Sequence, residues 1–152
     1  MATAPTAGYS GTPLATKLGI KAGSTVALLA APDEVVEQIS ATLPGDVRVR
    51  TRATGTAEVI VSFHTHRADL ERRVERLLAV LEVDGGLWLA WPKRASGVTT
   101  DITEDTIREV FLPLGLVDNK VCAINATWSG LRVVWRKELR AGRRALAADG
   151  AP

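Results

Sequence analysis

The stretch that decides the fold is residues 58–91, EVIVSFHTHRADLERRVERLLAVLEVDGGLWLAW. Its first part, Glu58 to Phe63, is mainly β-branched or apolar, which predicts a buried strand. Five apolar residues then recur at helical spacing between charged ones: Leu70, Val74, Leu77, Leu78 and Leu81. This pattern predicts an amphipathic helix that ends at Asp84-Gly85-Gly86, after which Leu87 to Trp91 form a second strand. A strand, a helix and another strand predict a parallel pair joined by a right-handed crossover.

The same alternation continues toward the N-terminus. A short helix is expected after Thr12, which can cap it, and Pro13, with Gly19 at its end. A strand, a helix and a strand should then follow, over Thr25 to Ala31, Asp33 to Leu43 and Val47 to Thr51. Arg48 and Arg50 alternate with valines in the last of these, as in an edge strand.

On the C-terminal side, a helix is predicted over Glu104 to Leu112, because Thr103 can cap it and acidic residues begin it. Val117 to Asn125 and Leu131 to Lys137 should form a hairpin that turns around Trp128-Ser129-Gly130, followed by a basic helix over Glu138 to Ala147. The elements together predict one α/β domain over residues 9–147, with a mainly parallel sheet and a C-terminal antiparallel hairpin. Residues 1–8 and 148–152 are expected to be a disordered N-terminal tail and a flexible C-terminal tail.

The composition is that of an ordinary globular protein. Of the 152 residues, 46% are hydrophobic and 24% charged, and no apolar run approaches the ~20 residues of a membrane span. The N-terminus shows no secretion signal, and Cys122 is the single cysteine, so a cytoplasmic protein with no membrane attachment is expected. A net charge of +2 permits nucleic-acid binding without requiring it.

Two stretches resemble class I methyltransferases. Residues 18–26, LGIKAGSTV, are similar to the lead-in to that family's first strand. Residues 58–63, the following helix and residues 85–89 are similar to its fourth strand, the next helix and its fifth strand, and the closing hairpin also matches. The resemblance implies a Rossmann-like scaffold over the folded chain.

The cofactor motif of that family is altered in this sequence. The family has an acidic residue and then a glycine-x-glycine turn after its first strand, where this chain has Leu28, Ala30 and Pro32. Glycines allow close approach to a ligand, whereas proline lacks an N–H and fixes its φ. The family's second strand commonly ends in an acid that binds ribose, but here the strand ends in Val49-Arg50-Thr51-Arg52. An intact S-adenosylmethionine site is therefore not expected, and the sequence predicts no cofactor.

The chain is also similar, at a finer level, to a bacterial domain family of unknown function, numbered three thousand and fifty-two. The phrases that carry this resemblance are GYSGTPL at residues 8–14, WPKRASGV at 91–98, VCAI at 121–124 and TWSGL at 127–131. The resemblance implies a cytoplasmic bacterial protein and brings no activity with it.

Ligands of open α/β sheets bind outside the carboxyl ends of the strands. The residues expected there include a long polar loop after the strand that ends at Trp91, and the candidate ligand-binding residues are His64, His66, Trp91, Lys93, Arg94, Ser96 and Asp101. Lys93 and Arg94, with the two histidines, could bind a small anion, and an exposed Trp91 could contact a protein partner or stack on a base. The alternatives are that the loop charges are only solvated and that Trp91 covers the core.

His64 and His66 would lie on one face of an extended segment, but only Asp69 is near enough in sequence to help, so no metal site is predicted. No sequence motif specifies a nucleophile. A second candidate surface is the basic C-terminal segment, Arg136, Lys137, Arg140, Arg143 and Arg144, which is opposed by the single acid Glu138.

These observations leave three hypotheses for the function. The first is a non-catalytic binding or regulatory protein on a methyltransferase-like scaffold. The second is a small-molecule enzyme whose site has been rebuilt at the carboxyl edge of the strands. The third is nucleic-acid binding through the basic C-terminal segment.

Overall fold

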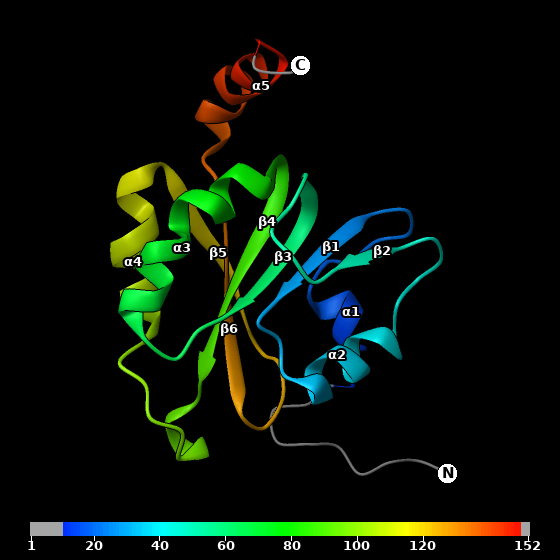
Figure 1. Ribbon diagram of the computed structural model, residues 1–152, viewed down its shortest axis with the longest axis vertical. Coiled ribbons are helices and arrows are strands. Elements are labelled where there is room, and N and C mark those ends of the chain that lie inside the picture. Colours follow the sequence, from blue (N-terminus) through cyan, green and yellow to red (C-terminus); the bar gives the residue numbers. More distant parts are fainter. Residues whose placement is uncertain (1–10, 150–152) are drawn as a thin grey trace.

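A six-stranded sheet lies at the centre of the protein, in the order β2-β1-β3-β4-β6-β5 (Figure 1). The computed structural model describes residues 11–149. The strands are β1 Thr25–Leu29, β2 Arg48–Arg50, β3 Ala57–Phe63, β4 Leu81–Pro92, β5 Leu116–Ala123 and β6 Trp128–Trp135. The α-helices are α1 Leu14–Lys17, α2 Asp33–Ser40, α3 Arg67–Val80, α4 Glu104–Phe111 and α5 Arg140–Asp149. Three short 3-10 helices are η1 Arg94–Ser96, η2 Leu112–Leu114 and η3 Lys137–Leu139.

The sheet is parallel except for one strand. β1 pairs in parallel with β2 and with β3, and β3 pairs in parallel with β4. β6 is antiparallel to both β4 and β5, so the predicted C-terminal hairpin is confirmed and β5 forms the edge. The turn comes earlier than predicted, before Trp128, because Asn125 Oδ1 accepts hydrogen bonds from the N–H groups of Thr127 and Trp128 at 2.9 Å.

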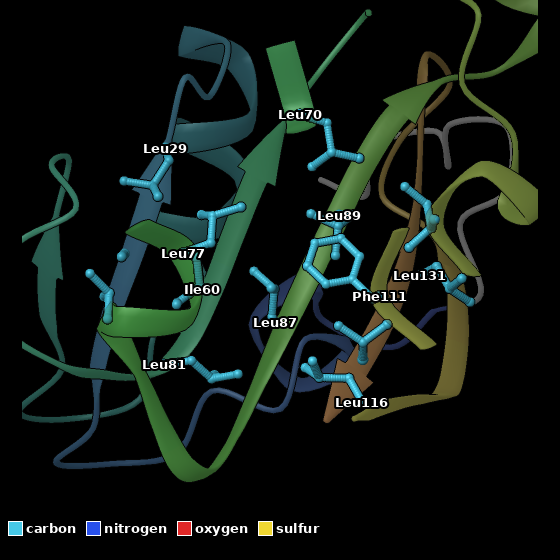
Figure 2. Close-up of a cluster of buried hydrophobic side chains, with 14 of the residues drawn as sticks. Leu29, Ile60, Leu70, Leu77, Leu81, Leu87, Leu89, Phe111, Leu116 and Leu131 are labelled. Atoms are coloured by element: carbon cyan, nitrogen blue, oxygen red, sulfur yellow. The ribbon is translucent and has the colours of Figure 1, made fainter. Parts of the chain in front are cut away.

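Both faces of the sheet are covered by helices, and each face has its own core. On one face, α3 and α4 bring Leu70, Leu77 and Phe111 against the sheet (Figure 2). On the other face, α1 and α2 pack Leu14 and Ile39 against the sheet. The central strands are therefore buried on both sides, which explains why they are continuous apolar runs in the sequence.

β4 shows how one strand serves both cores. Leu87, Leu89 and Trp91 belong to the α3–α4 side, whereas Trp88 and Ala90 belong to the α1–α2 side. Successive side chains of a strand point to opposite faces, which produces this alternation. The Trp88 indole is fully buried, and its Nε1–H donates to the Leu18 carbonyl oxygen at 3.0 Å.

The predicted end of the long helix is wrong. α3 ends at Val80, and Leu81 is already extended and paired with Ala57, so Asp84-Gly85-Gly86 lies within β4. β3 and β4 shift register between Ala57 and Val59, and a Cβ on Gly85 would come within 2.5 Å of the Glu58 carbonyl oxygen. Gly85 thus allows two strands to approach closely, and it does not end a helix.

Other boundaries differ by a few residues. The first helix begins at Leu14 with Pro13 before it, and no side chain caps it, so Thr12 is not its cap. Gly19 does follow this helix with a φ of +78°, as predicted. The basic C-terminal helix begins with η3 and continues as α5, which projects beyond the sheet in Figure 1.

The predicted N-terminal tail, residues 1–8, lies outside the described residues. Residues 150–152, the end of the predicted C-terminal tail, also lie outside them. The backbone of α5 continues to Asp149. Within residues 11–149, no helix combines the length and the apolar character that crossing a bilayer requires.

Candidate functional site

A cleft of about 420 Å³ opens at the carboxyl end of β4, between the loop that carries η1 and the start of α4. Its lining residues are Trp91, Pro92, Arg94, Gly97, Val98, Thr99, Thr100, Ile102, Thr103 and Glu104. This is the edge where ligands of open α/β sheets bind, and the volume lies within the range of small-molecule sites. The cleft is therefore our candidate functional site, which we call the β4 cleft.

The loop that forms one wall of the β4 cleft is held by its own polar side chains. Ser96 Oγ donates to the Lys93 carbonyl oxygen at 2.6 Å and accepts from the Val98 N–H at 3.1 Å. Thr100 Oγ1 donates to the Thr65 carbonyl oxygen at 2.7 Å. Asp101 Oδ1 accepts from the Arg67 N–H, at the start of α3, at 2.7 Å. Ser96 and Asp101 thus shape the loop through these bonds, and neither of them lines the cleft.

Trp91 and Arg94 are the two predicted site residues that the structure brings into the cleft. Trp91 is only 7% exposed and belongs to the core, so its indole forms part of the cleft's apolar floor. Arg94 is exposed on the rim, in η1. Lys93, next to it, is half-buried, and its backbone N–H donates to the Thr127 carbonyl oxygen at 2.7 Å.

α4 begins beside the cleft as predicted. Thr103 caps it: Thr103 Oγ1 accepts from the Thr106 N–H at 3.3 Å, and the Thr103 N–H donates to Thr106 Oγ1 at 3.0 Å. Glu104 pairs with Arg108 on the next turn, at 3.1 Å. Glu104, the acidic residue of the lining, is thus already paired with a cation. Arg94 is the charged lining residue that remains to bind a ligand.

His64 lies outside the cleft and is 3% exposed. Its Nε2 is 2.7 Å from Ser62 Oγ, and its Nδ1 is 2.9 Å from Asp69 Oδ2 on α3. Burial lowers the pKa of His64 below its ordinary value, against the opposing effect of Asp69, so the imidazole is neutral at pH 7. A neutral ring with its Nδ1 proton toward Asp69 accepts at Nε2 from the Ser62 hydroxyl.

Ser62, His64 and Asp69 are hydrogen-bonded in the pattern of a serine hydrolase triad, with the serine at one ring nitrogen and the aspartate at the other. Ser62 is only 1% exposed, so no substrate can reach its oxygen in this structure. The three residues instead fasten the start of α3 to the end of β3. Burial opposes ionisation of Asp69, but hydrogen bonds from His64 and Arg73 outweigh it and lower the pKa of Asp69.

Sequence reasoning missed this network. The available signal was Ser62 two residues before His64 on a strand, with Asp69 in the first turn of the next helix. The second histidine, His66, is exposed and precedes α3, so the two imidazoles do not act together. Among the described side chains, those of residues 11–146, no three from His, Cys, Asp or Glu are placed to hold a metal ion.

In the turn after β1, a residue other than glycine adopts a left-handed backbone conformation that usually favours glycine. Ala30 has a φ of +57°, in the left-handed region, and Pro32 leads directly into α2. The first turn of α2 carries Asp33 and Glu34, whose negative charges complement the helix dipole themselves. An anionic ligand group would meet two carboxylates at this helix start.

β2 stops short of the same edge. Its last residue, Arg50, is level with Ala27, whereas β1 continues to Leu29. Arg50 Nη1 donates to the carbonyl oxygens of Thr54 and Thr56, at 2.9 and 3.2 Å, and so closes the loop behind it. Residues 51–56, which follow β2, include no carboxylate.

The basic C-terminal segment is partly engaged within the molecule. Arg140 Nε donates to the Trp135 carbonyl oxygen at 3.0 Å, and the Arg143 guanidinium lies 3.7 Å from the centre of the Trp135 ring. Arg144 pairs with Asp84 at 2.9 Å. Arg136 and Lys137 are exposed at the end of β6.

With this geometry, the class of the fold is defined: a methyltransferase-like Rossmann fold with an antiparallel strand near its C-terminal edge. The structure is similar to that of an S-adenosylmethionine-dependent methyltransferase from Aquifex aeolicus, with a TM-score of 0.59 and 12% identity over 78% of this chain and 85% of that chain. A putative type 11 methyltransferase from Sulfolobus solfataricus gives a TM-score of 0.56 and 10% identity over 82% and 90% of the two chains. Ribosomal protein L11 methylase from Lactobacillus delbrueckii subsp. bulgaricus gives a TM-score of 0.56 and 11% identity over 81% and 75%.

At these identities the likeness establishes the fold alone. No family model matches the sequence, and no curated protein matches it. The resemblance of four sequence phrases to a bacterial family of unknown function stays a prediction.

Proposed function

We propose that this protein is a non-catalytic binding protein on a methyltransferase-like scaffold, and that its ligand is a small molecule with an anionic group, bound in the β4 cleft. The observation that carries the proposal is that the cleft lies at the carboxyl end of β4 and has Arg94 on its rim and Trp91 in its floor. The proposal includes a bacterial, cytoplasmic setting, which rests on the sequence phrases alone.

The chemistry at the end of β1 argues against S-adenosylmethionine as the ligand. A glycine turn normally brings backbone N–H groups close to that ligand's position. Here Pro32 has no N–H, and two carboxylates follow it at the start of α2. β2 is short, Arg50 is turned to its own loop, and residues 51–56 after it carry no carboxylate to accept from ribose hydroxyls.

The lining of the β4 cleft fits a ligand with a flat or apolar body. Trp91, Pro92 and Ile102 supply apolar surface, and Trp91 and Ile102 are held by the core beneath. The Arg94 guanidinium can bind a carboxylate or phosphate through two parallel N–H donors. The exposed Thr99 adds a hydroxyl on the same loop.

Benzoate is the minimal probe of this chemistry, because it joins a flat ring to one carboxylate. Titration followed by amide and indole NMR signals should move those of Trp91, Arg94 and Thr99. Arg94→Gln should weaken binding by roughly tenfold, the worth of a charge-assisted hydrogen bond. Arg52→Gln is the matched control, because it removes the same charge from the loop after β2.

S-adenosylmethionine and S-adenosylhomocysteine are titrated in parallel by calorimetry, and no binding is expected. Micromolar binding of either, or methyl transfer by the purified protein, would show that the proposal is wrong. Benzoate shifts that survive Arg94→Gln unchanged would remove the β4 cleft from consideration.

A further inference from the structure

A second cleft, of about 480 Å³, lies at the opposite edge of the sheet, where the parallel strands begin. It is formed by residues far apart in the sequence: Gly19, residues 21–24, Glu58, Val59, Asp84, Gly85 and Arg132. The loop before β1 and the first half of β4 supply its walls. We call it the Arg132 cleft, after the one arginine that lines it.

Arg132 is half-buried on β6, opposite Trp88 on β4 and Lys120 on β5. Its guanidinium makes no hydrogen bond or ion pair with any other residue in the described part of the chain. Burial lowers the pKa of Arg132, and the nearby positive charge of Arg140 adds to this effect. No buried polar side-chain atom in the described residues lacks a hydrogen-bond partner, so the unbonded N–H groups of this half-buried arginine are open to solvent, where an anion that enters the cleft can accept from them.

Two carboxylates also line this cleft, and each has a partner within the molecule. Glu58 Oε1 accepts a hydrogen bond from the Thr25 N–H at 2.8 Å, and Asp84 pairs with Arg144 at 2.9 Å. Lys21, exposed on the loop before β1, lines the same cleft and adds a second positive charge. With Asp84 paired to Arg144, the lining has two cations, Arg132 and Lys21, and one carboxylate without a cationic partner, Glu58, so its net charge is positive.

Gly86 makes room for the guanidinium. A Cβ at this position would overlap Arg132 Nε and Cζ, so any other residue would displace the side chain. Since Gly86 lies within β4 and pairs with Val59, glycine here weakens the strand while it leaves space for the arginine. The absence of a side chain thus sets where the Arg132 charge lies.

We propose that the Arg132 cleft binds the phosphate group of a small phosphorylated molecule, with Arg132 as its anchor and Lys21 as a second cation. A guanidinium matches phosphate through two parallel N–H donors, and an ammonium adds a point charge. The cleft volume lies within the range of small-molecule sites. This site is separate from the β4 cleft and does not depend on it.

The test uses inorganic phosphate and ribose 5-phosphate as probes, at low ionic strength, with amide NMR signals as the readout. Both should move the signals of residues 22–24 and Gly85, and ribose 5-phosphate should bind more tightly. Arg132→Gln should weaken binding roughly tenfold or more and leave thermal stability nearly unchanged, because the guanidinium makes no hydrogen bond or ion pair within the described residues that would be lost. Gly86→Ala keeps the charge but displaces it, so it should also weaken binding.

Arg94→Gln is the control, since it acts at the other edge of the sheet and should leave phosphate binding intact. Three results would overturn the proposal: no shifts around residues 22–24 at millimolar phosphate, shifts that Arg132→Gln does not change, or a lower melting temperature in Arg132→Gln with binding intact. Tighter binding of a single-stranded oligonucleotide, with a steep salt dependence, would also overturn it in favour of a nucleic-acid surface.

Discussion

Replacing Ala30 by glycine should make this protein more stable. Ala30 is exposed and follows β1 with a φ of +57°, a conformation that is unfavourable for every residue with a Cβ. The side chain buries little, so its removal costs little packing. Ala30→Gly therefore changes mainly the backbone energy of one residue.

The magnitude follows from two opposing terms. A left-handed backbone costs a residue with a Cβ about 1–2 kcal/mol, which glycine avoids. Glycine in turn adds about 0.5–1 kcal/mol of conformational entropy to the unfolded chain. The net effect is a stabilisation of about 0.5–1 kcal/mol, which corresponds to a rise in melting temperature of about 1–4 °C for a chain of this size.

Urea unfolding and thermal melts of the wild type, Ala30→Gly and Ala31→Gly measure this effect. Ala31 lies in the same loop without a positive φ and packs partly against the α1–α2 core, so Ala31→Gly has the entropic cost, loses some packing and should destabilise. If both variants lose stability equally, the argument from the Ala30 backbone is refuted. Ala30→Gly should also fail to bind S-adenosylmethionine, because Pro32 and the acids of α2 remain.

Three further predictions concern other parts of the fold. Thr103→Ala should lower the free energy of unfolding by about 1 kcal/mol, because it removes the cap of α4; urea unfolding measures it, with an unchanged m-value as the control. Trp88→Phe should lower the free energy of unfolding by about 1–3 kcal/mol or more, because it leaves the buried Leu18 carbonyl oxygen without its donor. A loss below about 0.5 kcal/mol would contradict the hydrogen bond between Trp88 Nε1 and this oxygen. Because the pKa of His64 is lowered in the folded protein, the unfolded state binds a proton at this residue more readily than the folded state. The free energy of unfolding should therefore have its full value above pH 6.5, the ordinary pKa of histidine, and fall as the pH drops below it. Unfolding measured from pH 8 to 5 should show this fall in the wild type and a shallower one in His64→Gln.

The order of strands and helices could be predicted because local patterns specify it. Residues 67–80 have a helical period, and β1, β3 and β4 are apolar runs that both cores bury. The junction of α3 and β4 could not be predicted in this way. Leu81 fits the helical period as well as a strand, and its pairing with Ala57, a contact distant in sequence, decides between them.

The candidate site could be predicted in part for a similar reason. Ligands of open α/β sheets bind at the carboxyl ends of the strands, and this rule alone points to Trp91 and Arg94. The burial of His64 depends on how α3 docks, which brings Asp69 to its Nδ1. The Arg132 cleft was missed because residues 21–24, 58, 84 and 132 share no local pattern, and they meet at the edge that ligands rarely use.

Both ends of the sheet bear on how the protein behaves when it is concentrated. At one end, β2 has only three residues, two of them arginines. At the other end, β5 shifts register between Asp118 and Lys120, and Arg108 of α4 binds Asp118 at 3.1 Å. A short charged strand and a bulged strand are poor templates for a strand from another molecule. Growth of the sheet from copy to copy, the first step toward fibrils, is thereby disfavoured at each end.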